Sequence, residues 1–390
     1  MTVQSHPPEP LAAARALAPT IRARADEIEA GRRLPADLAR QMAEAGLFRL
    51  LVPASLGGAE ADPATLLNVI EAVAEADGAA GWCVMIGATS GLTAAYLPET
   101  AAREIYGADP AAITGGVFAP MGKAVAVDGG YQVSGQWQWA SGSQNCAWLM
   151  GGSVILDDGK PRLLENGMPD SRMMLFPADQ VEIIDTWQAA GLCGTGSHDM
   201  AVADRFVPAE RSVSLITDRP RANGPLYTFP VFGLLAMGIA AVTLGIARRS
   251  ISELIELAQA KTPTLSRSKL AKRSRVQSDL AEAEAMLRSA RAFLFEATAA
   301  AWDSASSAGE IPLEERTDLR LAASHAVRAA AGAVDLMYNA GGGSAVFRTS
   351  PLQRCFRDVH VATQHMMVSP TTFELTGRLL LGLDTDTAML

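Results

Sequence analysis

The stretch DGGYQVSGQWQWASGSQNCAWLMGG, residues 128–152, shows the clearest local pattern in the chain. It opens with Asp-Gly-Gly, which is a turn signal because glycine adopts positive φ without a side-chain clash. From Tyr131 to Trp139, apolar and aromatic residues alternate with polar ones, which is the period of two of a half-buried strand. One interpretation is therefore a hairpin strand with a packed ladder of aromatic side chains.

The end of this strand allows a second interpretation. Trp139, Ala140, Ser141 and Gly142 place an indole, a small side chain, a hydroxyl and a bare backbone side by side. A planar ligand could lie against the indole while the hydroxyl and the backbone N–H groups contact its edge. The residues alone leave the ligand platform and the packed hairpin both open.

The sequence around this strand predicts a β domain over residues 111–215. Residues 115–122 are glycine-rich and are expected to form a loop. Short apolar segments, separated by turn residues, lie at residues 124–127, 154–156, 173–176, 181–184 and 200–207. Strands at this spacing imply a small sheet or barrel. The sequence GTGS at residues 194–197 lacks the helix opening and the later acidic residue of a dinucleotide-binding fingerprint, so it predicts a flexible loop.

Helical patterns flank the β domain on both sides. Residues 1–110 predict an N-terminal helical domain, in which Asp62-Pro63 supplies a helix cap and a first-turn proline. Residues 78–96 are apolar and rich in small side chains, which predicts a buried helix. Residues 216–390 contain long alanine-rich helices that are expected to pack as an antiparallel bundle. The fold class is mainly α with a central β domain.

One apolar run, residues 231–247, approaches the length of roughly 17 residues that spans a bilayer. Its glycine and alanine content suits close helix packing equally well, and Arg248 and Arg249 follow it directly. We interpret this run as a buried helix.

The overall composition narrows the classes of partner. The chain has 390 residues, of which 49% are hydrophobic, so it can bury a sizeable core divided between two or three domains. A net charge of −9 without a basic block argues against nucleic acid and anionic membranes as partners. Four widely spaced cysteines and the absence of a signal-peptide pattern predict a cytoplasmic protein without disulfides.

Five histidines are the candidates for proton transfer. His6 lies in the N-terminal tail, His325 in an alanine-rich helix, and His198 could simply accept a hydrogen bond in a turn. His360 and His365 would lie about 140° apart on a helix, so they would not bind one metal ion there. A histidine with its ordinary pKa near 6.5 is suited to moving protons at neutral pH. For His365, a satisfied core histidine is the alternative.

The order of helices, strands and helices resembles the acyl-CoA dehydrogenase superfamily across nearly the whole chain. The matching stretches are residues 47–58 (LFRLLVPASLGG), 130–143 (GYQVSGQWQWASGS), 191–199 (GLCGTGSHD) and 340–358. The resemblance implies an N-terminal helical domain, a middle β-barrel or sheet domain and a C-terminal four-helix bundle. It also implies a flavin between the sheet and the bundle.

The same resemblance implies roles for particular residues. Trp139 would pack on the flavin isoalloxazine and Ser141 would hydrogen-bond near its N5 atom, while Phe118 and Ala119 are also expected to bind the cofactor. The run Gly341, Gly342 and Gly343 resembles the segment that lines the dinucleotide part of the cofactor, usually across a subunit boundary in a homotetramer.

The departures from the family pattern distinguish its branches. A dehydrogenase needs a carboxylate to remove the substrate α-proton, but residues 362–366 and 231–232, where it would be expected, contain no acid. His365 instead resembles the histidine of the flavin-dependent two-component monooxygenases (group D). Those enzymes take reduced FMN or FAD from a separate reductase and react it with O2 through a C4a-hydroperoxide. Ser141 and His365 would then be the catalytic residues acting on a small organic substrate, with aromatic molecules among the candidates.

Two alternatives stay open. One is an acyl-CoA dehydrogenase that oxidises an acyl thioester with FAD, and the other is a catalytically silent binding or scaffold protein of the same fold. Ser90 lies near the position where many of these monooxygenases carry another histidine, so activation of a phenol would need different chemistry here.

Overall fold

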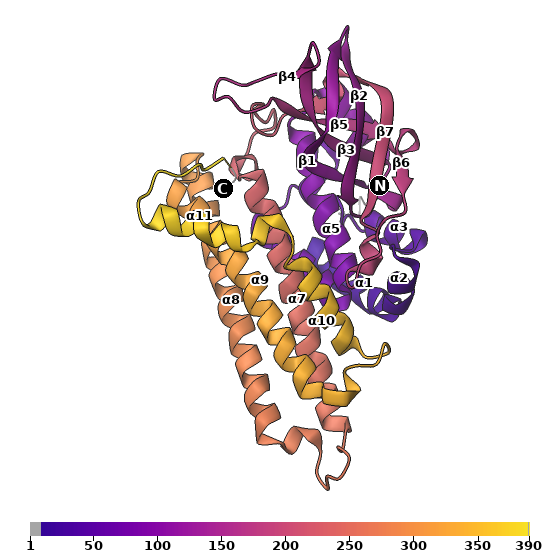
Figure 1. Ribbon diagram of the computed structural model, residues 1–390, viewed down its shortest axis with the longest axis vertical. Helices are drawn as coiled ribbons and strands as arrows, with labels where there is room; N and C mark the ends of the chain where they lie inside the picture. Colours follow the sequence, from indigo (N-terminus) through magenta and orange to yellow (C-terminus); the bar gives the residue numbers. More distant parts are fainter. Residues whose placement is uncertain (1–8, 389) are drawn as a thin grey trace, which may run out of the picture.

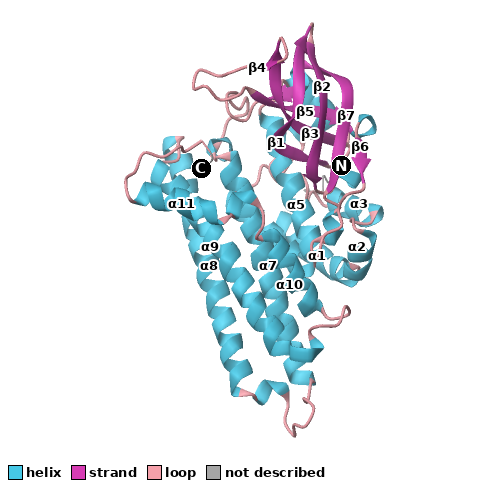
Figure 2. Ribbon diagram, viewed as in Figure 1, coloured by secondary structure: helices cyan, strands magenta, loops and turns pink. Residues whose placement is uncertain are grey.

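The computed structural model describes residues 9–388 and residue 390, and therefore leaves His6 outside the described residues. Figure 1 shows a sheet at one end of the molecule, a group of N-terminal helices beside it, and a long helical bundle extending away from both. Figure 2 shows that the strands are confined to this single region. The predicted fold class, mainly α with a central β domain, is confirmed.

The N-terminal helices are α1 (Pro10–Ala23), α2 (Ala25–Gly31), α3 (Ala36–Glu44), α4 (Pro63–Ala76), α5 (Gly78–Gly91) and α6 (Glu99–Ala102). Side-chain caps mark the start of three of them, α1, α4 and α5. The predicted cap at Asp62 is confirmed, since its carboxylate accepts a hydrogen bond from the Thr65 amide at 2.9 Å. Asp77 caps α5 in the same way, accepting from the Ala80 amide at 2.9 Å. Helix α5 is buried almost throughout.

Eight strands form one sheet in the order β6-β7-β2-β1-β3-β5-β8, with β4 paired to β3. They are β1 (Thr114–Val127), β2 (Gly130–Ala140), β3 (Trp148–Asp157), β4 (Lys160–Pro161), β5 (Ser171–Pro177), β6 (Glu182–Ile184), β7 (His198–Pro208) and β8 (Ser212–Val213). The pairing of β1 with β3 is parallel, and the other pairings are antiparallel.

The expected loop at residues 115–122 was wrong, because these residues belong to β1. A register shift between Val117 and Gly122 accommodates the irregular sequence within the strand. Gly116 has φ +145°, and a Cβ there would lie 2.0 Å from the Met150 carbonyl oxygen. The glycines are thus needed for close strand contact rather than for a loop.

Trp137 is the centre of the core inside the sheet. Its side chain is fully buried, and its indole N–H donates to the Gly152 carbonyl at 2.6 Å. Glycines at positions 122, 135 and 151 make room for the ring, because a Cβ at each would lie 2.4 to 2.8 Å from its atoms. The tryptophan and its glycines therefore fit as one unit.

The expected aromatic ladder was wrong in one respect, because Trp139 does not share the burial of Trp137. Trp139 has φ +67°, and the pairing of β2 with β7 shifts register between Trp137 and Ala140. This bulge turns the indole outward and leaves Trp139 60% exposed. A bulky residue at positive φ is a backbone outlier, and such outliers concentrate at functional sites.

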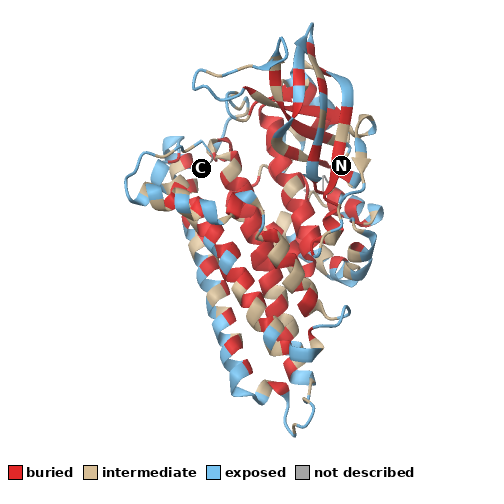
Figure 3. Cartoon of the chain, viewed as in Figure 1, coloured by how far each residue is buried: buried red, intermediate tan, exposed pale blue. Residues whose placement is uncertain are grey.

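The C-terminal region consists of α7 (Val231–Ala260), α8 (Ser274–Ala308), α9 (Leu313–Gly341), α10 (Pro351–Ala362) and α11 (Pro370–Leu380). Helices α7 to α10 lie side by side in Figure 1, and Figure 3 shows their inner faces buried. Of the described helices, α7 is long and apolar enough to cross a membrane, yet 83% of its most apolar window is buried inside the protein. This agrees with the interpretation of residues 231–247 as a buried helix.

We predict that Gly151→Ala destabilises the protein by about 1–3 kcal/mol, because the new Cβ would overlap the Trp137 ring. Chemical denaturation measures the free energy of unfolding. Gly377→Ala is the matched control, since the new Cβ would meet no neighbouring atom within 4 Å and α11 should tolerate alanine well. Equal denaturation midpoints for Gly151→Ala and the unsubstituted protein would contradict this account of the sheet core.

Candidate functional site

Trp82 joins the end of β2 to the C-terminal region. It lies on α5, buried, and its indole Nε1 donates a hydrogen bond to the Ser141 hydroxyl at 3.1 Å. The indole also packs against His365, whose ring centroid lies 5.8 Å away at an interplanar angle of 58°. Two of the sequence-predicted residues, Ser141 and His365, are therefore brought together by a third that the sequence did not identify.

The sequence contained one signal for Trp82. It is the one large aromatic residue in a helix otherwise composed of small and aliphatic residues, residues 78–91. A buried indole N–H needs a hydrogen-bond partner, so such a tryptophan marks a polar group nearby. Nothing in the sequence pattern alone indicates that this polar group is Ser141.

Ser141 lies at the start of a chain of hydroxyl groups. It is 5% exposed, and its Oγ lies 2.6 Å from the Ser197 Oγ. The Ser197 Oγ in turn lies 2.6 Å from the Thr195 Oγ1, which donates to the Leu192 carbonyl at 2.8 Å. The residues of the expected flexible loop at 194–197 are thus buried and hydrogen-bonded against the end of β2.

His365 follows α10 and caps the short turn Met366–Val368. Its Nδ1 accepts a hydrogen bond from the Met367 amide at 3.2 Å, so the neutral ring carries its proton on Nε2. Burial, together with the nearby Arg320 guanidinium, lowers the pKa of His365 to about 4. At neutral pH this residue is therefore an uncharged imidazole with an N–H available at Nε2.

Comparison with known proteins identifies the family. The family models "Acyl-CoA dehydrogenase, N-terminal domain" and "Acyl-CoA dehydrogenase, C-terminal domain" match residues 11–104 and 237–370. Indole-3-acetate monooxygenase from Pseudomonas putida is 34% identical, over 93% of this chain and 90% of that protein. The chain belongs to the acyl-CoA dehydrogenase superfamily.

Further relatives indicate the branch of this superfamily. The flavin-dependent monooxygenase oxygenase subunit HsaA from Rhodococcus jostii is 30% identical, over 91% of this chain and 93% of its own. The crystal structure of 3-HSA hydroxylase from Rhodococcus sp. RHA1 superposes with a TM-score of 0.89 at 30% identity, covering 99% of this chain and 100% of that one. The chain is thus a flavin-dependent oxidoreductase of the monooxygenase branch, as its resemblance to group D implied.

The remaining cofactor residues expected from the superfamily lie in two places. Phe118 and Ala119 belong to β1, and their carbonyl groups lie close to Gly152 on β3. Gly341, Gly342 and Gly343 end α9 at the far end of the bundle, where the Lys261 ammonium donates to the Gly341 carbonyl at 3.2 Å.

The distance along the bundle separates these glycines from the Trp82 site. Helix α7 rises about 28 Å over the 19 steps from Gly238, which packs on Met85, to Leu257, which packs on Gly341. A single chain therefore does not bring the glycine run to Trp139 and Ser141.

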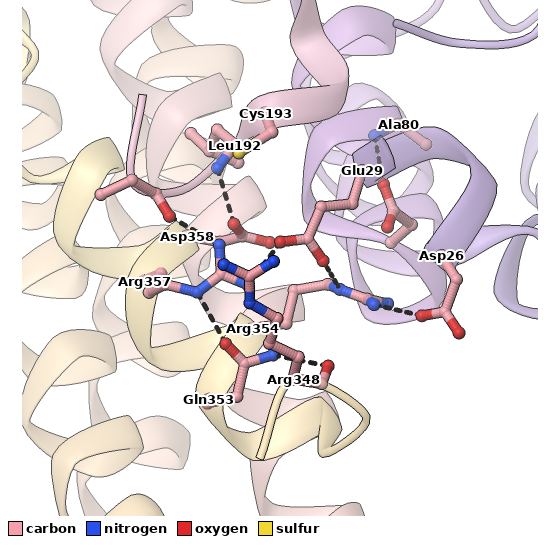
Figure 4. A network of polar contacts seen from close by, with 12 residues as sticks. Asp26, Glu29, Ala80, Leu192, Cys193, Arg348, Gln353, Arg354, Arg357 and Asp358 are labelled. Carbon is pink, nitrogen blue, oxygen red and sulfur yellow. Dashed lines mark hydrogen bonds and ion pairs between the residues drawn. The ribbon is translucent and has the colours of Figure 1, made fainter. Parts of the chain in front are cut away.

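A network of charged residues fixes the helix that leads to His365. Figure 4 shows Asp358 on α10 pointing toward Leu192, with Arg354 and Arg357 reaching Glu29 on α2. The buried Asp358 carboxylate accepts from the Leu192 amide at 2.6 Å. Burial, and then the nearby Asp77 carboxylate, raises the pKa of Asp358 to about 7. The network ties α10 to the loop that carries Thr195 and Ser197.

The other described histidines lie outside this site. His198 is buried, and its Nδ1 accepts from the Trp187 amide at 3.2 Å, which confirms the turn hydrogen bond expected for it. His360 contacts Asp335 at 2.8 Å, and the exposed His325 lies beside Phe293. Within residues 9–388, no group of three or more His, Cys, Asp or Glu side chains is arranged to hold a metal ion.

We predict that His365 makes folding stability fall at mildly acidic pH. Its folded pKa of about 4 lies below the ordinary 6.5, so between these values the unfolded chain binds a proton that the folded chain does not. Its contribution is complete above pH 6.5 and is lost as the pH falls toward 4, by on the order of 2 kcal/mol at pH 5.

Urea denaturation at pH 7 and pH 5 tests this. His365→Asn should lose less stability on acidification than the unsubstituted protein. His325→Asn, at an exposed position on α9, should lose as much stability as the unsubstituted protein. Parallel losses in all three proteins would show that His365 is not held neutral in the folded state.

Proposed function

We propose that this chain is the oxygenase component of a two-component monooxygenase that inserts one oxygen atom from O2 into a small aromatic molecule. A separate reductase would supply the reduced flavin. The observation that carries the proposal is the contact of Trp82 with both Ser141 and His365, which gathers three functional groups at the end of the strand that carries the outward-facing Trp139. The names of the relatives, which specify oxygenase subunits and aromatic substrates such as indole-3-acetate, support it.

The residues present fit a flavin. Trp139 offers a flat apolar face, and its strained backbone holds this face away from the core. Ser141 offers a hydroxyl two residues further on, and we propose that it contacts the N5 edge of the isoalloxazine. The bound reduced flavin would supply the electrons that activate O2. The structures of relatives include one with FADH2, at 28% identity.

His365 would act in this site as a hydrogen-bond donor. Its Nδ1 is occupied by the Met367 amide, which leaves the Nε2–H group to hydrogen-bond to a reacting oxygen atom and stabilise charge that develops there. The depressed pKa keeps the ring uncharged at neutral pH, so it does not add a positive charge to an apolar pocket. The Trp82 indole packs beside the ring and limits its contact with water.

We further propose a cytoplasmic homotetramer in which Gly341 to Gly343 of one subunit contact the flavin of another. The separation of about 28 Å along α7 supports this, because it places the glycine run away from Trp139 and Ser141 of its own subunit. Gly342 and Gly343 also have open space at their Cβ positions, as a backbone surface for a ligand requires.

Anaerobic mixing with reduced FMN or reduced FAD, followed by a pulse of oxygen, tests the proposed reaction. We expect a transient absorbing species that outlives the reaction of free reduced flavin with oxygen by at least tenfold. Return to oxidised flavin at the rate of free flavin would contradict the proposal. Bleaching of bound oxidised FAD by an acyl-CoA without any reductase would instead support the dehydrogenase.

We predict that Trp139→Ala weakens flavin binding by about tenfold or more, because base-sized rings gain 1–3 kcal/mol by stacking on an aromatic side chain. The stability of the flavin-free protein should change little, because the indole is 60% exposed. Phe206→Ala on β7 is the matched control, as this aromatic side chain is 49% exposed on the same sheet. Unchanged flavin affinity in Trp139→Ala, measured by titration, would remove Trp139 from the site.

A further inference from the structure

The hydroxyl chain behind Ser141 has a defined direction. The Leu192 carbonyl, at its far end, can only accept, so the 2.8 Å contact requires the Thr195 hydroxyl to donate its one proton there. Thr195 must therefore accept at its 2.6 Å contact with Ser197, and the Ser197 proton lies between them. By the same reasoning, the Ser141 proton lies in its 2.6 Å contact with Ser197.

This direction decides what Ser141 can offer to a ligand. Its proton is committed to Ser197, and one of its two lone pairs accepts from the Trp82 indole N–H at 3.1 Å. The remaining lone pair is the one group left, so Ser141 can accept a further hydrogen bond but cannot donate one without breaking the chain. If the Ser141 hydroxyl rotated to donate elsewhere, the buried Ser197 oxygen would lose the hydrogen bond that it accepts, which is unfavourable.

The far end of the hydroxyl chain, at Leu192 and Thr195, is held in place by further hydrogen bonds. The Leu192 amide donates to the buried Asp358 carboxylate at 2.6 Å, and the Leu192 carbonyl also accepts from the Trp187 indole at 3.1 Å. The Thr195 carbonyl accepts from the Gly142 amide at 2.7 Å, beside Ser141 itself. The loop therefore cannot shift independently of the end of β2, and the hydroxyl direction is built into the fold.

The two redox forms of a flavin differ at the atom in question. Oxidised flavin has only a lone pair at N5, whereas reduced flavin has an N5–H group that donates. We infer that Thr195 and Ser197 are positioning residues, which fix Ser141 as an acceptor and thereby make the site prefer reduced flavin to oxidised flavin. This inference rests on the proposed function, because it requires Ser141 to face the flavin N5.

The expected effect is a change in the ratio of two dissociation constants. The unsubstituted protein should bind reduced flavin more tightly than oxidised flavin. Ser197→Ala frees the Ser141 proton, which can then turn toward an accepting N5, so the ratio of the oxidised to the reduced dissociation constant should fall about tenfold. The midpoint potential of the bound two-electron couple should accordingly fall by about 30 mV. Thr195→Val should act in the same direction, because Ser197 loses its acceptor.

Three further variants distinguish an effect of the hydrogen-bond direction from an effect of altered side-chain packing. Ser197→Thr keeps the hydroxyl and should restore the ratio. Ser143→Ala removes a buried hydroxyl that has no hydrogen-bond partner among the described residues, two positions from Ser141, and should leave the ratio unchanged. In a Ser141→Ala background, adding Ser197→Ala should have no further effect, because the chain acts through Ser141.

Anaerobic and aerobic titrations with FMN and FAD, with the potential of the bound flavin as a second readout, test the inference. An unchanged ratio in both Ser197→Ala and Thr195→Val would overturn it. An equal change in Ser143→Ala, or a full Ser197→Ala effect without the Ser141 hydroxyl, would do the same. Equal affinity of the unsubstituted protein for both redox forms would overturn the inference alone, whereas binding of neither would overturn the proposed function as well.

Discussion

The hydrogen bond from the Trp82 indole to the Ser141 hydroxyl is the contact on which the site depends. It joins α5 of the N-terminal helices to the end of β2, and the same indole packs on His365 from the C-terminal region. A buried indole N–H without a partner would be unfavourable, so the bond fixes where the helix, the strand and the histidine can meet. Three segments far apart in the sequence therefore converge at one tryptophan.

A buried cluster of charged residues around Asp358 holds the neighbouring segments together (Figure 4). Asp358 is held among Asp77, Glu29, Arg354 and Arg357, at a junction where three parts of the chain meet (Figure 4). Removing a carboxylate from water is unfavourable, and the raised pKa of Asp358 records that cost. The hydrogen bond to the Leu192 amide, and the loop that this bond positions, account for the presence of the residue there.

The sequence predicted the features that arise from interactions between residues close together in the chain. The cap at Asp62, the buried helices and the alternation in β2 as far as Trp137 each depend on residues within a few positions, and the structure contains all three. The outward turn of Trp139 was not predictable, because it comes from a register shift against β7 and a positive φ that no residue pattern specifies. The glycines of β1 were mistaken for a loop because the residues that they contact closely, Met150 for Gly116 and Trp137 for Gly122, lie on other strands.

The candidate site was harder to predict than the fold. Trp139, Ser141 and His365 were selected through a family resemblance, and only the structure brings the last two together through Trp82. The partners of Ser141 lie 59 and 56 positions away in the sequence, which is beyond the reach of any local pattern.

A crystal structure of this protein with reduced flavin, prepared without oxygen, would test the central claim most directly. We predict an isoalloxazine ring stacked on Trp139, with its N5 within hydrogen-bonding distance of the Ser141 Oγ and its reactive face toward His365. A flavin bound elsewhere, or one whose N5 lies against a different group, would contradict the assignment of the site.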